Sequence, residues 1–167
     1  KLKASEKFSK AIIESMSDGF SILDENGVHI DVNPAFCKIT GFSKEELIGK
    51  GTPHPYWPKE EYANIQKAFV KTSQGNFESF ELVFKRKDGK RLPVRISPSQ
   101  IKDKKGNVVS NYATVTDISE RKHFENELIA SERKFRDAIT YAPYPIMIHA
   151  DGEVLQLSKE WVNRTGY

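Results

Sequence analysis

The stretch SDGFSILDENGVHIDVNPAFCKITGFSKEELIGK, residues 17–50, decides the fold of this chain. In its first half, apolar Phe20 and Ile22 alternate with their neighbours, which is the period of a half-buried strand. Asn26-Gly27 favours a tight turn, because both residues tolerate positive φ. We therefore expect two short antiparallel strands, one on each side of this turn.

Two short helices are expected next. Asn33 is a good N-cap residue, and Pro34 occupies the first helical position, where a missing N–H costs no hydrogen bond. Gly41 suits the left-handed residue that ends a helix. Ser43 and Glu46 then match a capping box, which predicts the start of the second helix.

The rest of the first domain passes from irregular to helical and then to β-structure. Residues 52–58 contain too many prolines for regular structure, and a longer amphipathic helix is expected from Pro58 to about Thr72. Turns at residues 88–89 and 103–107 separate three segments of alternating polarity. These segments predict a meander of three strands.

This order of elements predicts an α+β fold. A five-stranded antiparallel sheet carries the short helices on one face, and an N-terminal and a C-terminal helix flank it. Two prolines fall inside the fourth strand, where a proline removes a ladder hydrogen bond. We therefore expect a bulge or a strand edge at Pro93 and the end of regular pairing at Pro98.

The chain then begins the same pattern again. Residues 25–42 return in altered form as residues 150–167, with aromatic, turn-glycine and helix-ending glycine positions in agreement. Such self-similarity predicts a tandem array of one domain type. Between the repeats, residues 117–138 contain neither Gly nor Pro, and their apolar residues recur at spacings of three and four. This pattern predicts a helix with a short coiled-coil seam.

Three motifs resemble the PAS sensor family. NPAF, TGFS and EELIGK, within residues 33–50, resemble its first two helices. Residues 80–99, FELVFKRKDGKRLPVRISPS, resemble its third and fourth strands. Residues 117–122, DISERK, are similar to the signature that ends the fifth strand and enters the signalling helix. The resemblance implies a module that senses or relays a signal within a multidomain protein, and we expect a sensor histidine kinase of a two-component system.

With this resemblance the chain divides into four parts. They are an N-terminal flanking helix at 1–17, a PAS domain at 18–118, a signalling helix at 119–140 and the start of a second PAS domain at 141–167. The second unit stops before its last three strands, so we expect a segment of a longer protein. An isolated hairpin is marginal in water. Residues 143–157 are therefore expected to pair with another chain or to pack on the first domain.

The resemblance also implies a ligand pocket between the sheet and the helices. The apolar residues at the expected positions are candidates for its lining, and an irregular segment with His54 borders it. The candidates are Phe36, Ile39, Leu47, His54, Tyr56, Trp57, Ile65, Phe69, Phe80, Leu82, Val94, Ile96 and Ala113. The alternative is that these large side chains fill the gap as an ordinary core.

No cofactor is identified by the sequence. Thr52 occupies the position of the cysteine that forms a flavin adduct in light-oxygen-voltage members of the family, and Cys37 lies one helix earlier. The long helix lacks the histidine that haem-binding members use, so neither a flavin adduct nor haem is expected. His29 and His149 have no partner at metal-ligand spacing, which predicts no metal site.

The segment is not expected to be catalytic. His123 is not followed by the proline typical of a kinase phosphoacceptor, and no nucleophile is paired with a base. The 26 basic and 23 acidic residues are interspersed, which argues against a nucleic-acid partner. No apolar run approaches the roughly 18 residues of a membrane span, so no membrane contact is expected of this segment. The single cysteine suits the reducing cytoplasm.

Two functions from different classes remain open. The first is a sensory or relay module whose signal leaves through Asp117, Ile118, Phe124 and Leu128. It predicts a homodimer through the flanking helices, at Phe8–Ile12 and Phe124–Leu128. The second is a passive dimerisation or spacer domain with no ligand.

Overall fold

The structure is a computed structural model that describes residues 2–75 and 77–166. The first part of the chain contains α1 (Leu2–Ser15), β1 (Gly19–Leu23), β2 (His29–Val32), α2 (Pro34–Thr40), α3 (Lys44–Leu47), the 3-10 helix η1 (Lys59–Glu61) and α4 (Tyr62–Ser73). The rest contains β3 (Phe80–Lys85), β4 (Arg91–Lys102), β5 (Val108–Asp117), α5 (Ser119–Thr140), β6 (Met147–Ala150), β7 (Glu153–Leu157) and α6 (Lys159–Thr165). The chain divides into two compact units, with the boundary between Ser119 and Glu120.

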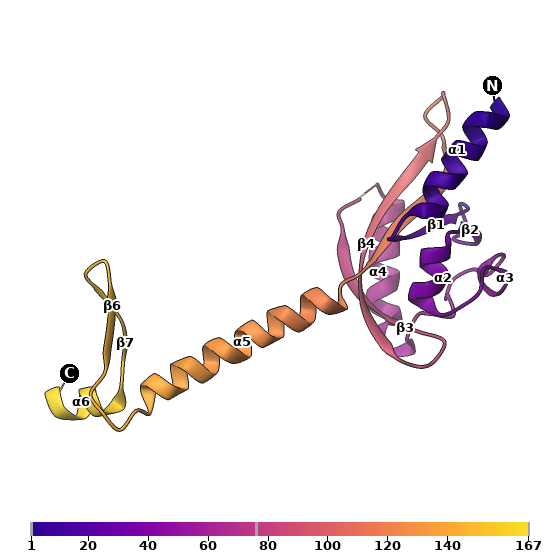
Figure 1. The fold of residues 1–167 in the computed structure, drawn as a ribbon. Coiled ribbons are helices and arrows are strands. Elements are labelled where there is room, and N and C mark those ends of the chain that lie inside the picture. Colours follow the sequence, from indigo (N-terminus) through magenta and orange to yellow (C-terminus); the bar gives the residue numbers. More distant parts are fainter. Residues whose placement is uncertain (1, 76, 167) are drawn as a thin grey trace. The chain divides into compact units, whose positions relative to one another are not determined.

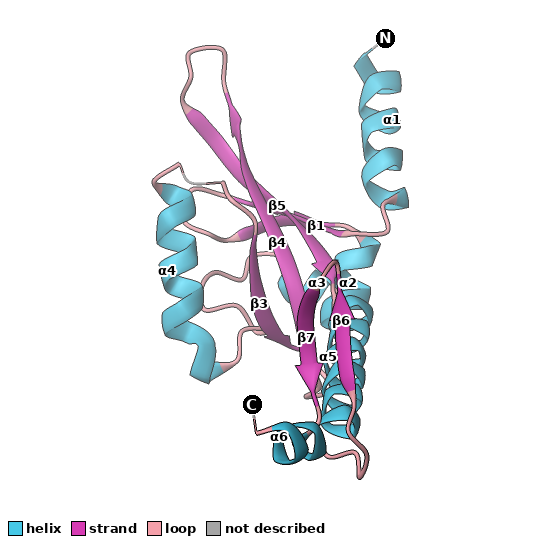
Figure 2. Ribbon diagram, turned by 90° about the vertical axis from the view of Figure 1, so that its left-hand side faces the viewer, coloured by secondary structure: helices cyan, strands magenta, loops and turns pink. Residues whose placement is uncertain are grey.

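The first unit is an α+β domain built on a five-stranded antiparallel sheet (Figure 1). Its strand order is β2-β1-β5-β4-β3, so β1 pairs with the last strand of the meander. Helices α2, α3 and α4 cover one face, and Figure 2 shows α4 beside that face. The core between helices and sheet is made of Val32, Phe36, Ile39, Leu47, Tyr56, Trp57, Ile65, Phe84, Leu92, Val94 and Val115. The predicted fold class is confirmed.

Asn33 joins three elements at the start of α2. Its side-chain oxygen accepts hydrogen bonds from the backbone N–H groups of Phe20 and Phe36, both at 2.8 Å. Its amide nitrogen donates to the carbonyl oxygens of Ile13 and Asp18, at 3.0 and 2.9 Å. The predicted N-cap therefore also ties α1 and β1 to the helix.

The β3–β4 hairpin closes the other end of α2. The Arg86 guanidinium donates to the carbonyl oxygens of Lys38 and Ile39, at 3.0 and 2.9 Å. The backbone N–H of Lys87 donates to the carbonyl oxygen of Thr40 at 3.0 Å. The last carbonyls of a helix lack partners within it, and here the hairpin supplies donors.

The inward face of β1 differs from the one that its apolar residues suggest. Pairing with β5 places Ser21 opposite Ala113 and turns Ser21 toward the helices, where it is buried. Phe20 faces the other way, with its ring centroid 5.5 Å from that of Tyr112. Register with β5 decides the face, and a five-residue strand carries too little apolar signal to reveal it.

Pro93 lies at an edge on one side, as expected, because the β4–β5 pairing begins only at Val94, whereas the expected end of regular pairing at Pro98 is wrong. Pro93 pairs with Val83, and Pro98 pairs with Ala113, both in regular register, and β4 continues to Lys102. The carbonyl of Pro93 accepts from the N–H of Ile118 at 3.1 Å, one residue beyond the end of β5.

The reason lies in the direction of each missing N–H. In an antiparallel strand the N–H and C=O of one residue point to the same neighbour, and successive residues alternate between neighbours. Pro93 therefore points toward β5 where β5 has already ended, and Pro98 points toward β3 before β3 begins opposite Ile96. Pro98 therefore removes no ladder hydrogen bond, and Pro93 removes at most the one that Ile118 would accept just beyond the end of β5.

The second unit reproduces the local structure of the first repeat. β6 and β7 pair as an antiparallel hairpin, and Ser158 caps α6 as Asn33 caps α2. Gly41 and Gly166 end these two helices with φ of 78° and 77°. The predicted contact of residues 143–157 with another chain or with the first domain stays a prediction.

Candidate ligand pocket

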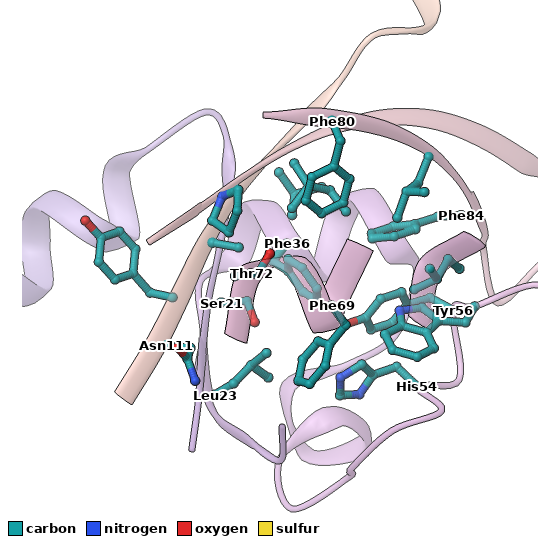
Figure 3. Close-up of a pocket in the computed structure, with 18 residues that line it drawn as sticks. Ser21, Leu23, Phe36, His54, Tyr56, Phe69, Thr72, Phe80, Phe84 and Asn111 are labelled. Carbon is teal, nitrogen blue, oxygen red and sulfur yellow. The ribbon is translucent and has the colours of Figure 1, made fainter. Parts of the chain in front are cut away.

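A cavity of about 100 Å³ lies between the inner face of the sheet and helices α2 and α4 (Figure 3). Most of its wall is apolar and aromatic. The predicted residues that line this cavity are Phe36, His54, Tyr56, Trp57, Ile65, Phe69, Phe80, Leu82, Ile96 and Ala113. The other three, Ile39, Leu47 and Val94, are buried in the core beside it.

Sequence reasoning missed part of this wall. The missed residues are Ser21, Leu23, Thr72, Phe84, Pro98, Asn111, Tyr112 and Val115. Phe84 continues the alternation of Phe80 and Leu82, so the period of β3 could have found it. Ser21 and Leu23 required the register of β1 against β5, which no local pattern gives.

A buried polar cluster adjoins the cavity. His29 is 1% exposed, and its Nδ1 and Nε2 form hydrogen bonds with Ser21 Oγ at 3.1 Å and Tyr56 Oη at 2.9 Å. The His54 ring lies 4.3 Å from the His29 ring, measured between centroids, and stacks on Tyr56 at 5.2 Å. The sequence alone gives His29 no role, because its partners Ser21 and Tyr56 lie on other elements.

In this cluster, His54 is the residue whose ring nitrogens lack hydrogen-bond partners. Its side chain is 2% exposed, and neither ring nitrogen has a hydrogen-bond partner among the described residues. A buried polar atom without a partner costs about 1–3 kcal/mol. Because His54 forms part of the cavity wall, a molecule in the cavity could supply the missing partner.

The cluster carries no charge at neutral pH. Burial lowers the pKa of His29 to about 4, and burial together with the nearby His29 lowers the pKa of His54 to about 3. Burial also raises the pKa of Tyr56 well above its usual value. Each imidazole is therefore neutral and offers one N–H donor and one acceptor nitrogen.

Ionic and metal chemistry find no support in this pocket. No Lys, Arg, Asp or Glu belongs to the cavity wall in the described part of the chain. Within residues 2–75 and 77–166, no group of three or more His, Cys, Asp and Glu side chains could hold a metal ion. Cys37 lies in a separate groove beside Asp31 and Lys44, and burial raises the pKa of its thiol.

The end of β5 connects the cavity wall to the start of α5. Val115 of the wall pairs with Ile96, and three residues later Ile118 is buried and bonds to Pro93. The carboxylate of Asp117 accepts a hydrogen bond from the N–H of Ser119 at 2.8 Å. Further along α5, Phe124 and Leu128 are 59% and 62% exposed.

Comparison with known proteins places this chain in a family. Residues 17–120 match the family model of the PAS domain. The chain therefore belongs to the PAS domain family.

None of the described helices is both long enough and apolar enough to span a membrane.

Sensor kinases are among its relatives. The chain is 32% identical over 125 residues to the C4-dicarboxylate transport sensor protein DctS of Rhodobacter capsulatus, covering 73% of this chain and 19% of that protein. It is 24% identical over 134 residues to the signal transduction histidine-protein kinase AtoS of Escherichia coli, covering 79% of this chain and 21% of AtoS. The chain thus spans about a fifth of the length of these relatives.

Solved structures share the fold. A PAS domain of a protein from Colwellia psychrerythraea superposes with a TM-score of 0.63 at 19% identity, covering 70% of this chain and 98% of that one. A PAS domain of an HTR-like protein from Haloarcula marismortui gives 0.58 at 22% identity, covering 70% and 94%.

Proposed function

We propose that this PAS domain is the sensory and relay module of a longer sensor histidine kinase. A small molecule binds in the cavity, and the change passes through β5 to α5. The observation that carries this proposal is the cavity itself, with the buried and unpartnered His54 in its wall. A passive spacer would have no use for an unsatisfied polar group there, because such a group only lowers stability.

The relay follows the pairing of the sheet. Ile96 and Val115 belong both to the cavity wall and to the β4–β5 ladder, so a ligand that moves them moves the end of β5. Ile118 and Asp117 then transmit the displacement to the first turn of α5. The segment itself catalyses nothing in this proposal, and it acts in the cytoplasm on a kinase domain elsewhere in the parent protein.

Binding is tested by screening small molecules against residues 1–167, with native mass spectrometry and thermal shift as readouts. Ala113→Leu places extra side-chain volume in the cavity and should abolish binding of any compound found. Ala130→Leu is the matched control, because Ala130 is exposed on α5. If no compound binds, or if Ala113→Leu still binds it, the spacer function is favoured.

The relay is tested in the parent protein by autophosphorylation with and without the compound. Asp117→Ala should retain binding and lose the response, because it frees the start of α5 from β5. Asp103→Ala is the matched control, since Asp103 makes the same bond to the N–H two residues on, at 2.8 Å to Lys105. An unchanged response in Asp117→Ala would contradict the route through Asp117.

A further inference from the structure

The pocket has a size, an uncharged wall and one buried ring without a hydrogen-bond partner among the described residues, and together they define a ligand class. This inference rests on the proposed sensory function. We propose that the cavity selects a neutral molecule no larger than one six-membered ring, whose polar group hydrogen-bonds His54, and that it rejects carboxylates of the same size.

Size sets the first limit. A cavity of about 100 Å³ is of the same order as the roughly 150 Å³ apolar cavity that holds benzene in an engineered protein, and far below the roughly 300–1,000 Å³ of drug-sized sites. Rings of Phe36, Phe69, Phe80 and Phe84 form much of the wall. Aromatic faces and edges favour a flat, largely apolar guest.

His54 supplies the polar contact in a fixed orientation. Its ring stacks on Tyr56 at 9° and meets Trp57 edge-on at 90°, with centroids 5.2 and 5.0 Å apart. Figure 3 shows the imidazole among the residues of the cavity wall, beside the ring of Tyr56. Three packed rings, with His29 as the third, hold His54 so that a ligand hydroxyl or N–H can pair with it at little entropic cost.

The described cavity wall contains no Lys or Arg to pair with a carboxylate, and this excludes carboxylate ligands. A carboxylate entering this wall would lose its water and meet neither Lys nor Arg among the described lining residues. The two histidines do not replace them, since burial keeps both rings neutral. The relative from Rhodobacter capsulatus is named for C4-dicarboxylates, but a dicarboxylate does not suit the cavity of this chain.

Three probes of one ring size test the proposal by calorimetric titration of residues 1–167 at neutral pH. Phenol is neutral and hydrogen-bonds, toluene is neutral and does not, and benzoate is charged. We expect phenol to bind and benzoate to bind at least about tenfold more weakly. The ratio of the toluene to the phenol dissociation constant measures the net effect of the hydroxyl, and its change in a His54 variant isolates the contact with His54.

Variants of His54 separate its role from packing. His54→Phe should lower the toluene-to-phenol ratio about tenfold, the value of one buried hydrogen bond, while His54→Gln should keep most of it. His149→Phe, on the exposed strand β6, should leave the ratio unchanged. Benzoate binding as tight as phenol, or an unchanged ratio in His54→Phe, would overturn the proposal.

Two further outcomes distinguish this inference from the proposed function. If a larger or charged compound from the screen binds while these probes do not, the ligand class is wrong and the sensory function stands. If neither the probes nor any compound binds, both are wrong.

Discussion

At the scale of the residue, two imidazole rings lie in the interior of the first unit with centroids 4.3 Å apart. A proton on either ring would be a charge away from water, and burial disfavours it. His29 compensates its burial with hydrogen bonds to Ser21 and Tyr56, whereas His54 has no such partner in the described chain. The pair makes stability sensitive to acid.

Stability should fall as pH drops below about 6.5. Between that value and the folded pKa values of about 4 and 3, the unfolded chain binds protons that the folded chain excludes. The free energy of unfolding is therefore complete above about pH 6.5 and loses roughly 2 kcal/mol per histidine by about pH 5. Urea titrations at a series of pH values measure this slope.

Two variants test which histidine causes the pH dependence of the free energy of unfolding. His54→Phe should remove about half of it, whereas His123→Gln should leave it unchanged, because His123 is exposed on α5. A His54→Phe domain with the full pH dependence would show that the acid sensitivity comes from other groups.

At the scale of the element, β4 shows how the lengths of neighbouring strands decide what a proline costs. It pairs with β3 on one side and β5 on the other, and it carries two prolines in a position that normally excludes them. The prolines are tolerated because their neighbours have ended or not yet begun. Strand lengths, and not proline itself, decide the cost.

A proline should therefore cost little stability at position 93 of β4 and much more at position 95, two residues further along the strand. Pro93→Val should change the free energy of unfolding by less than about 1.5 kcal/mol, since at most one hydrogen bond is gained, to Ile118 at the end of the ladder. Arg95→Pro should cost at least about 2 kcal/mol, because the N–H of Arg95 faces Thr116 within the β4–β5 ladder. Arg95 is exposed, so this substitution reports on the backbone.

Denaturant unfolding of the three proteins provides the comparison, with Arg95→Ala to account for the side chain. Equal destabilisation by Pro93→Val and Arg95→Pro would contradict the assigned N–H directions.

At the scale of the whole molecule, the two units differ in how much they bury. The first has a continuous apolar core. In the second, Ser158 alone is buried among the described residues 120–166, and Leu155, Val154 and Tyr144 are more than half exposed. Regions with few buried contacts open at low free energy.

Hydrogen exchange should separate the units. Amides of β4 and β5 should exchange only through global unfolding, while those of β6 and β7 should exchange orders of magnitude faster where nothing covers the hairpin. Mass spectrometry of peptides after a timed D₂O pulse measures both in one sample. Protection of β6–β7 equal to that of β4–β5 would mean that the hairpin is covered by another chain or by the first unit, as the sequence predicted.

A homodimer through the flanking helices is the prediction for association. Phe8 and Ile12 of α1 and Phe124 and Leu128 of α5 are 48–69% exposed, as unpartnered seam residues would be. Phe124→Asp should shift sedimentation toward the monomer at tens of micromolar protein and reduce kinase output, while the neighbouring exposed Asn126→Asp should not. A monomeric wild-type protein at that concentration would contradict the dimer.

The sequence by itself determined the features whose causes lie within a few residues. The N-cap at Asn33, the helix-ending Gly41, the Asn26-Gly27 turn and the alternation of β3 follow from local backbone preference and side-chain period. The family motifs then extended these elements to a PAS fold and a pocket lined by its apolar positions.

Only the tertiary structure decided which polar groups meet. His29 forms a hydrogen bond with Tyr56, which lies 27 residues later in the sequence. Ser21 faces inward because β1, the first strand, pairs with β5, the last strand of the sheet. The same long-range pairing decides that Pro93 and Pro98 cost the sheet little. These outcomes depend on register between distant segments, and register arises from the packing of the whole sheet, which no local pattern encodes.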